Sequence, residues 1–357
     1  MSFAASERPR HFASDNYAGV CPEVWEALRS ADANHSQGYG DDPHTAEARE
    51  RFRTLFESEC EVHFTFNGTA ANSLVIAAAC APFQAVICHA YAHIETDESN
   101  APGFFAHGIK TLPIGSPSGK LEPDAVERVF RQRRDIHASE PRVLSLTQST
   151  ELGTVYSPEE LSSLCQRAHS LGMVVHVDGA RFSNAAASLG VSPAELTWKA
   201  GVDALCFGGT KNGMLASEAV VFFNQDLARH FKRRCKQAGQ LASKMRYHAA
   251  QWNGMLSAGA WLRRAQHANE MARLLSDRLR SVPGVRLLQP VEANAVFVDF
   301  PPGLAEELLA LGWRFYTDVG PGGARLMCAW NTSREDVEEF VQHAIVTAGA
   351  KSAPKSR

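Results

Sequence analysis

The sequence predicts an α/β protein with a mostly parallel seven-stranded sheet, followed by a smaller α+β domain. Between residues 60 and 225, short apolar segments alternate with helical segments. This alternation is typical of a parallel sheet that is covered by helices on both faces. After residue 225 the pattern changes to long helical stretches and then to short strands with helices between and after them. A chain of 357 residues is long enough for one large and one smaller domain.

The expected strands are short apolar runs bounded by glycine, proline or polar residues. They cover residues 61–66, 84–89, 109–114, 142–148, 173–178, 203–207 and 218–223. The clearest helix signal combines Ser157 as N-cap, Pro158 in the first turn and Gly172 at the stop. Residues 225–282 are expected to be nearly all helical, with an interruption around the QWNG segment, 251–254.

These patterns divide the chain into four parts. We expect an N-terminal arm at 1–14, a large domain over 15–250, a small C-terminal α+β domain over 251–350 and a disordered tail at 351–357. The tail is short and basic, a composition that cannot bury enough apolar surface to fold.

The composition argues against several classes of protein. Hydrophobic residues make up 45%, charged residues 21%, and the net charge is −3, so no basic surface for nucleic acid or an anionic membrane is indicated. No apolar run approaches the roughly 18 residues that span a bilayer, and the start lacks the apolar segment of a signal peptide. The eight cysteines contain no CxxC pair, which indicates free thiols in a reducing compartment, and we expect a cytoplasmic location.

Two polar side chains are expected at the carboxyl ends of neighbouring strands. Asp178 ends the strand in HVDGAR, and Lys211 follows the next strand in CFGGTKNG. Ligands of open α/β sheets bind at this edge, where a carboxylate can pair with a pyridinium nitrogen and a lysine can react with an aldehyde. Taken singly, each residue has an ordinary alternative, because Asp178 could cap a helix and Lys211 could be a surface charge.

A third segment, Asn67-Gly68-Thr69, connects a strand to the start of a helix. The exposed amides and the positive end of such a helix bind phosphate well, although a plain capped helix has the same sequence pattern. A phosphate cradle, an acid for a ring nitrogen and an amine for an aldehyde together match pyridoxal 5′-phosphate.

With these motifs the chain resembles the threonine aldolase family, within the beta-eliminating lyases of fold-type I, and a low-specificity phenylserine aldolase fits the same pattern. The likeness runs from ASDN (13–16) through YGDDP (39–43) to ARLMCAW (324–330). It implies retro-aldol cleavage of a β-hydroxy-α-amino acid to glycine and an aldehyde, in a homotetramer or homodimer. The family's ENTHN segment is TQSTELG here, and this departure leaves substrate selectivity open.

The resemblance also implies roles for particular residues. Lys211 would be the Schiff-base lysine, Asp178 would pair with the pyridine nitrogen, and His93 would stack on the ring. The remaining implied contacts are phosphate binding by Gly68 and Thr69, carboxylate binding by Arg181 and Arg325, substrate contact by Ser14 and Tyr39, and proton transfer from the β-hydroxyl by His137 or His93.

Rival readings use the same residues. A β-eliminating lyase or an aminotransferase on this scaffold would give ammonia or a keto acid instead of an aldehyde. A metal-dependent hydrolase around His89 and His93 requires a glutamate at position 90, where the chain has Ala90. We therefore expect no metal.

Overall fold

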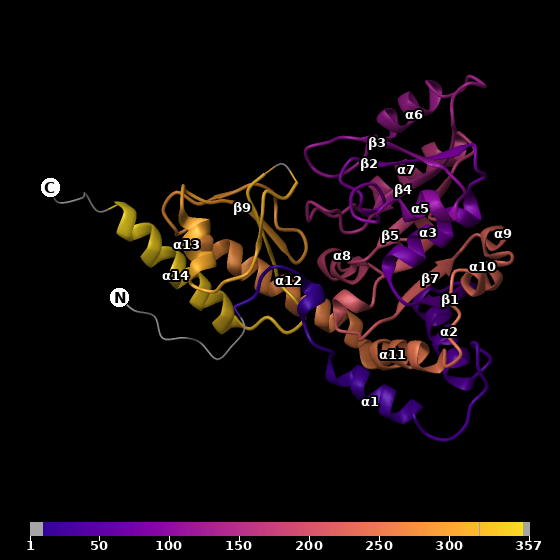
Figure 1. The fold of residues 1–357 in the computed structure, drawn as a ribbon, viewed down its shortest axis with the longest axis horizontal. Coiled ribbons are helices and arrows are strands. Elements are labelled where there is room, and N and C mark those ends of the chain that lie inside the picture. Colours follow the sequence, from indigo (N-terminus) through magenta and orange to yellow (C-terminus); the bar gives the residue numbers. More distant parts are fainter. Residues whose placement is uncertain (1–9, 321, 353–357) are drawn as a thin grey trace.

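The computed structural model describes residues 10–320 and 322–352, and it contains both predicted sheets (Figure 1). The seven-stranded sheet has the order β1-β7-β6-β5-β4-β2-β3. Its strands are β1 (Glu61–Thr65), β2 (Gln84–His89), β3 (Lys110–Ile114), β4 (Glu140–Thr147), β5 (Val174–Gly179), β6 (Ala204–Phe207) and β7 (Glu218–Phe222). Only β7 is antiparallel to its neighbours, β1 and β6. The prediction of a mostly parallel sheet is confirmed.

Helices cover both faces of this sheet. They are α1 (Pro22–Ala31), α2 (Pro43–Phe56), α3 (Gly68–Ala79), α4 (His93–Thr96), α5 (Ala101–Phe105), α6 (Pro123–Arg131), α7 (Pro158–Ser170), α8 (Phe182–Leu189), α9 (Gln225–Ala228), α10 (Phe231–Gln237) and α11 (Arg246–Leu256). Four short 3₁₀ turns join them: η1 (Asp15–Tyr17), η2 (Trp198–Ala200), η3 (Thr210–Asn212) and η4 (Ser257–Gly259). The capping box of Ser157 at α7 forms as its sequence predicts.

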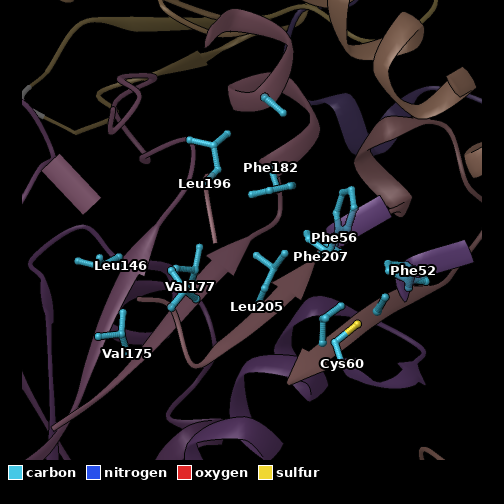
Figure 2. Close-up of a cluster of buried hydrophobic side chains, with 14 of the residues drawn as sticks. Phe52, Phe56, Cys60, Leu146, Val175, Val177, Phe182, Leu196, Leu205 and Phe207 are labelled. Carbon is cyan, nitrogen blue, oxygen red and sulfur yellow. The ribbon is translucent and has the colours of Figure 1, made fainter. Parts of the chain in front are cut away.

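The core on one sheet face is aromatic (Figure 2). Phe207 of β6 packs against Trp252 of α11, and Phe52 of α2 packs against the same indole, each with ring centroids 5.0 Å apart. The opposite face is covered by α3, α5 and α10. Because strand side chains alternate, Val175 and Val177 point into the aromatic core, while Asp178 lies on the face that α3 covers.

The small sheet is antiparallel, with the order β10-β11-β9-β8. It consists of β8 (Arg286–Leu287), β9 (Ala295–Asp299), β10 (Tyr316–Thr317) and β11 (Ala324–Met327), with helices α13 (Leu304–Ala310) and α14 (Arg334–Ser352). Phe12 is buried in its core, 5.6 Å from the Trp313 ring. The described end of the N-terminal arm therefore packs on the small domain.

Helix α12 (Ala260–Leu279) connects the two cores, because it packs against α8 at one end and α14 at the other (Figure 1). The exact domain limits stay a prediction. Of the expected tail, Lys351 and Ser352 end α14, and 353–357 lie outside the described residues. Within the described part of the chain, no helix combines the length and the apolar character needed to cross a membrane.

The helix interruption expected around QWNG falls just after this segment. Residues 251–254 lie inside α11, and the helical stretch is broken at 229–230, at 238–245 and at η4. Each polar side chain of the segment has a tertiary partner: Gln251 accepts from the Leu215 amide at 2.9 Å, and Asn253 donates to the His44 carbonyl at 3.0 Å. Gly254 faces the Glu23 carbonyl so closely that a Cβ would lie 2.5 Å from it. Packing on α1 and α2 therefore overrides the local turn signal.

Candidate active site

The candidate active site lies at the carboxyl ends of β5 and β6, beside the first turn of α3. A cavity of about 430 Å³ opens there. Its lining includes half of the ten site residues predicted from the sequence: Gly68, Thr69, His93, Asp178 and Lys211. The other lining residues are Asn16, Phe66, Asn67, Asp97, Ala180, Cys206, Gly208, Thr210, Leu215, Ala216 and Glu218. Residues from six segments of the chain thus converge on one space.

The α3 end of the cavity is the predicted strand-to-helix turn. Asn67 caps the helix by accepting a hydrogen bond from the Ala70 amide at 2.9 Å. The amides of Gly68 and Thr69 belong to the first turn, where N–H groups have no partner within the helix. Together with the positive end of this 12-residue helix they form a site that suits a phosphate.

The turn before Lys211 requires its two glycines. A Cβ on Gly208 would lie 2.4 Å from the Ala180 carbonyl oxygen, and one on Gly209 would lie 2.5 Å from the Ser217 carbonyl oxygen. The turn can therefore pass close to β5 and β7 only without side chains. It delivers Lys211 into the cavity, where burial and the nearby Arg181 guanidinium lower the pKa of the amine. A lowered pKa favours the neutral, nucleophilic amine.

Asp178 is buried at the end of β5. Its Oδ1 accepts from the Ala180 amide at 3.0 Å, and its Oδ2 accepts from the Asn72 side-chain amide at 2.9 Å. These two donors hold the carboxyl group in place, and it faces the same cavity as Lys211.

His93 is the first residue of α4, and two glutamates hold it. Glu151 accepts from its backbone N–H at 3.0 Å, and Glu98 lies 2.8 Å from its Nδ1. The hydrogen bond to Glu98 raises the pKa of His93 against the effect of burial. Burial in turn raises the pKa of Glu98, and it raises that of Glu151 to about 7.

Arg181 was expected to bind the substrate carboxylate, and the structure gives it an internal partner. Its Nε and Nη2 donate to both oxygens of Asp15 at 2.7 and 2.8 Å, and Asn294 donates to the same carboxylate at 3.1 Å. Only Nη1 lies outside this bidentate pair. Although burial alone raises the pKa of Asp15, the Arg181 guanidinium holds it below its usual range.

Arg325 has more donors to offer. Its Nη2 donates to the Ala13 carbonyl at 3.2 Å, and its guanidinium lies 5.3 Å from the Tyr316 ring centroid. Among the described residues its buried Nε has no hydrogen-bond partner. Burial and the charge of Arg181 lower its pKa. A buried donor without a partner is the state expected of a residue that binds an anionic ligand.

Three further predicted residues, His137, Tyr39 and Ser14, are not among the lining of the cavity that holds Lys211. His137 is exposed on the loop before β4, whereas Asp178 and Lys211 follow the carboxyl ends of β5 and β6. Tyr39 is exposed and packs on the Lys236 ammonium, 4.5 Å from its ring centroid. Ser14 caps η1 by accepting from the Asn16 amide at 3.2 Å, and it lines a neighbouring smaller pocket. Their roles remain predictions.

In the structure, one of the two histidines of the alternative metal site, His89, is already engaged by backbone groups. The His89 ring lies among backbone groups, with Nδ1 3.1 Å from the Tyr91 amide and Nε2 3.0 Å from the Ser116 amide. In the described part of the chain, one group with metal-ligand spacing occurs, His93 with Glu98 and Asp178. Hydrogen bonds among these side chains and Asn72 already engage that group.

Sequence reasoning missed the buried acids around the site. Asp15, Glu98 and Glu151 carry the hydrogen bonds described above, and Glu218 accepts from the Gly209 amide at 2.6 Å under the lysine turn. Burial raises the pKa of Glu218 to about 7. Asp15 belongs to the ASDN motif (13–16), so that motif could have indicated Asp15 as a site residue. For Glu98 the signal was an acid five residues after a candidate histidine.

Fold and site together define a fold-type I enzyme, in which a buried aspartate at the end of β5 and a lysine in the turn after β6 share one cavity. The chain belongs to the beta-eliminating lyase family, which matches residues 11–301. It is 55% identical to a low specificity L-threonine aldolase of Pseudomonas aeruginosa, over 97% of this chain and 100% of that protein. A second low specificity L-threonine aldolase, from a Pseudomonas species, is 54% identical over 94% of this chain and 97% of that protein. A solved threonine aldolase structure from Leishmania major superposes with a TM-score of 0.89 at 26% identity, covering 95% of this chain and 100% of that one.

Proposed function

We propose that the protein cleaves β-hydroxy-α-amino acids of the threonine or phenylserine type to glycine and an aldehyde, with pyridoxal 5′-phosphate as cofactor. The observation that carries this proposal is the shared cavity of Lys211, Asp178 and the first turn of α3. The names of the similar Pseudomonas proteins support the substrate class.

The residues present fit this cofactor. The amides of Gly68 and Thr69 offer donors for a phosphate, the fixed Asp178 carboxylate suits a protonated ring nitrogen, and the Lys211 amine suits an aldehyde. When bound, pyridoxal 5′-phosphate supplies an acceptor for the electron pair of the broken Cα–Cβ bond.

The chain's own side chains bind and orient the substrate. Arg325, with its unpartnered Nε, is the better candidate for the substrate carboxylate, because Asp15 already holds two nitrogens of Arg181. A fixed carboxylate sets which bond at Cα is aligned for cleavage. Asp15 has a positioning role, since it fixes the guanidinium of Arg181 beside Lys211.

His93 is the proposed acceptor of the β-hydroxyl proton within one chain. It lines the cavity with Lys211, and Glu98 holds its ring at Nδ1. His137 is the alternative, because the resemblance assigns a histidine at that position to the same task. Its exposed position requires that it act from a neighbouring subunit or after a loop movement.

We also propose a homo-oligomer in the cytoplasm. Exposed Phe66 and Leu215 at the cavity mouth support an interface that covers the site. Eight free cysteines support a reducing compartment. Light scattering of the purified protein measures the oligomeric state, and a monomer at working concentration would contradict this part.

The function is tested with purified protein and added pyridoxal 5′-phosphate. Wild-type protein should show a visible absorption band, borohydride should fix the cofactor on the peptide that contains Lys211, and L-threonine or phenylserine should yield glycine and the matching aldehyde. Lys211→Ala should lose all three signals. Lys199→Ala, which removes an exposed ammonium paired with Glu57, is the matched control and should retain them.

The products of the reaction distinguish the proposed aldolase from a β-eliminating lyase and from an aminotransferase. Ammonia with a keto acid would indicate β-elimination, and amino transfer to a keto acid would indicate an aminotransferase. Relative rates on threonine and phenylserine decide the substrate type. Wild-type protein that stays colourless and inert after the cofactor is supplied would overturn the proposal.

A further inference from the structure

We propose that Glu98 is a positioning residue that keeps the proton of His93 on Nδ1 and so presents the Nε2 lone pair to the cavity, and that Asn72 links this pair to Asp178. The role of His93 as the proton acceptor rests on the proposed function. The hydrogen-bonded arrangement itself rests on the geometry of the chain alone.

The geometry joins four side chains, from α3, α4, β5 and the loop after α4. Glu98 Oε1 lies 2.8 Å from His93 Nδ1 and accepts from Asn72 Nδ2 at 2.9 Å. The same Asn72 nitrogen donates to Asp178 Oδ2 at 2.9 Å. The ligand atoms of His93, Glu98 and Asp178 all lie within 4.8 Å of one another. One amide nitrogen thus connects the proposed base to the proposed partner of the cofactor ring.

The contact with Glu98 favours one tautomer of neutral His93. An ionised Glu98 carboxylate only accepts hydrogen bonds, so it places the imidazole proton on Nδ1 and leaves the lone pair on Nε2. The His93 side chain is 38% exposed, whereas that of Glu98 is fully buried. The ring therefore has its fixed edge against a buried acid and its remaining surface at the cavity that it lines.

Asn72 reduces the cost of placing two acids so close together. Its amide nitrogen donates one hydrogen bond to each carboxyl group. An aspartate or leucine at position 72 would leave Glu98 and Asp178 to repel each other without a donor between them. In the described residues Glu98 Oε2 and Asn72 Oδ1 are buried without partners. Glu98 therefore takes part in the linkage only through Oε1, and Asn72 only through Nδ2.

Charged groups on several elements face His93. Glu98 and Asp178 favour its protonated form, whereas burial and Lys211 disfavour it. Glu151 holds the backbone N–H from the loop after β4, and Asp97 lines the same cavity. The hydrogen bond to Glu98 is the largest of these effects and raises the pKa of His93.

The proton transfer balances on these atoms. The O–H bond of the substrate breaks and a new N–H bond forms at Nε2, while the Nδ1 proton stays against Glu98. The electron pair of the O–H bond forms the aldehyde carbonyl as the Cα–Cβ bond breaks, and the pair from Cα–Cβ stays on the glycine part. Glu98 then faces an imidazolium, so its charge stabilises the state that follows transfer.

The first experiment uses the protein without added cofactor. Histidine labelled with ¹⁵N reports which ring nitrogen carries the proton, and the His93 signals are assigned by their loss in His93→Gln. We expect an Nδ1–H tautomer and a His93 pKa above the ordinary 6.5 in wild-type protein. Glu98→Gln should lower that pKa by about 1 unit, and Glu98→Leu should abolish the tautomer preference. His169, which meets Asp203 through the other ring nitrogen, Nε2, is an internal reference.

The second experiment measures kcat/KM against pH with cofactor and substrate. The acid limb should move to lower pH in Glu98→Gln. The value of kcat should fall about tenfold, which is a part of the roughly 10²–10⁴-fold that a positioned base contributes in all. Glu95→Gln is the matched control, because Glu95 is an exposed acid on α4, the helix of His93, and contacts Thr111. It should match wild-type protein in both experiments.

The outcomes separate the two proposals. A His93 tautomer and pKa in Glu98→Gln that equal those of wild-type protein would overturn the role of Glu98, whatever the enzyme's activity. Wild-type protein without glycine and aldehyde products would overturn the proposed function and leave the first experiment valid. If Glu98→Leu fails to fold, the nearly isosteric Glu98→Gln decides alone.

Discussion

The buried ion pair of Asp15 and Arg181 gives the sharpest test of how the chain positions its site. Asp15→Asn keeps the size and one carbonyl oxygen of the side chain and removes its charge. The carboxylate is 1% exposed and accepts two hydrogen bonds from Arg181, at 2.7 and 2.8 Å. Removing one partner of a buried pair costs about 3–5 kcal/mol, because the remaining charge stays buried. Since one acceptor oxygen remains, we expect a loss of about 3 kcal/mol.

The assay is urea unfolding of the protein without cofactor, at pH 7 and at lower pH. Arg181 holds the pKa of Asp15 below 3.8, its ordinary value. The ion pair therefore stabilises the fold above about pH 4, and its contribution is lost as the pH falls through the lowered pKa. The difference in unfolding free energy between wild type and Asp15→Asn should be full at pH 7 and shrink below pH 4.

Glu57→Gln is the matched control, because it breaks an ion pair with Lys199 of the same 2.8 Å length in which both side chains are exposed. It should cost at most about 1 kcal/mol. The reasoning is refuted if Asp15→Asn costs no more than Glu57→Gln, or if its cost is equally large at pH 7 and at pH 3.

Further predictions concern the turn, the buried acids and the core. Gly208→Ala should destabilise the protein by about 1–3 kcal/mol and lower kcat/KM by roughly 10²-fold, because its Cβ would lie 2.4 Å from a backbone oxygen; Gly115→Ala, with no atom within 4 Å, should be silent in the same urea and activity assays. Glu151, whose pKa burial raises to about 7, is more easily protonated in the folded protein, so it stabilises the fold below pH 4.5 and loses this effect as the pH rises through 7. Glu151→Gln should therefore gain up to about 3 kcal/mol over wild type between pH 4.5 and pH 8 in cofactor-free protein, and a gain that does not change with pH would contradict this. Phe207→Ala should cost about 3–5 kcal/mol in urea unfolding, whereas Phe104→Ala, at 77% exposed, should stay within about 0.5 kcal/mol.

The sequence by itself determined the strand-and-helix order and the residues at the strand ends. Seven apolar runs became the seven strands, because short buried strands of a parallel sheet need continuous apolar side chains. Asp178 and Lys211 could be placed at one edge, since parallel neighbours end on the same side of the sheet. The Asn67 cap was visible as a local pattern as well, because capping involves residues only three apart.

Only the tertiary structure decided which partners these residues have. Asp15 meets Arg181 across 166 positions, and Asn72 meets Asp178 across 106, so no local pattern announces either contact. Packing also kept QWNG helical, because its side chains find partners on α2 and in the segment before β7. The local conformational preference of a short segment contributes less free energy than a buried hydrogen bond or a close backbone contact. The sequence therefore identified the reactive groups, while long-range packing determined how each is held and charged.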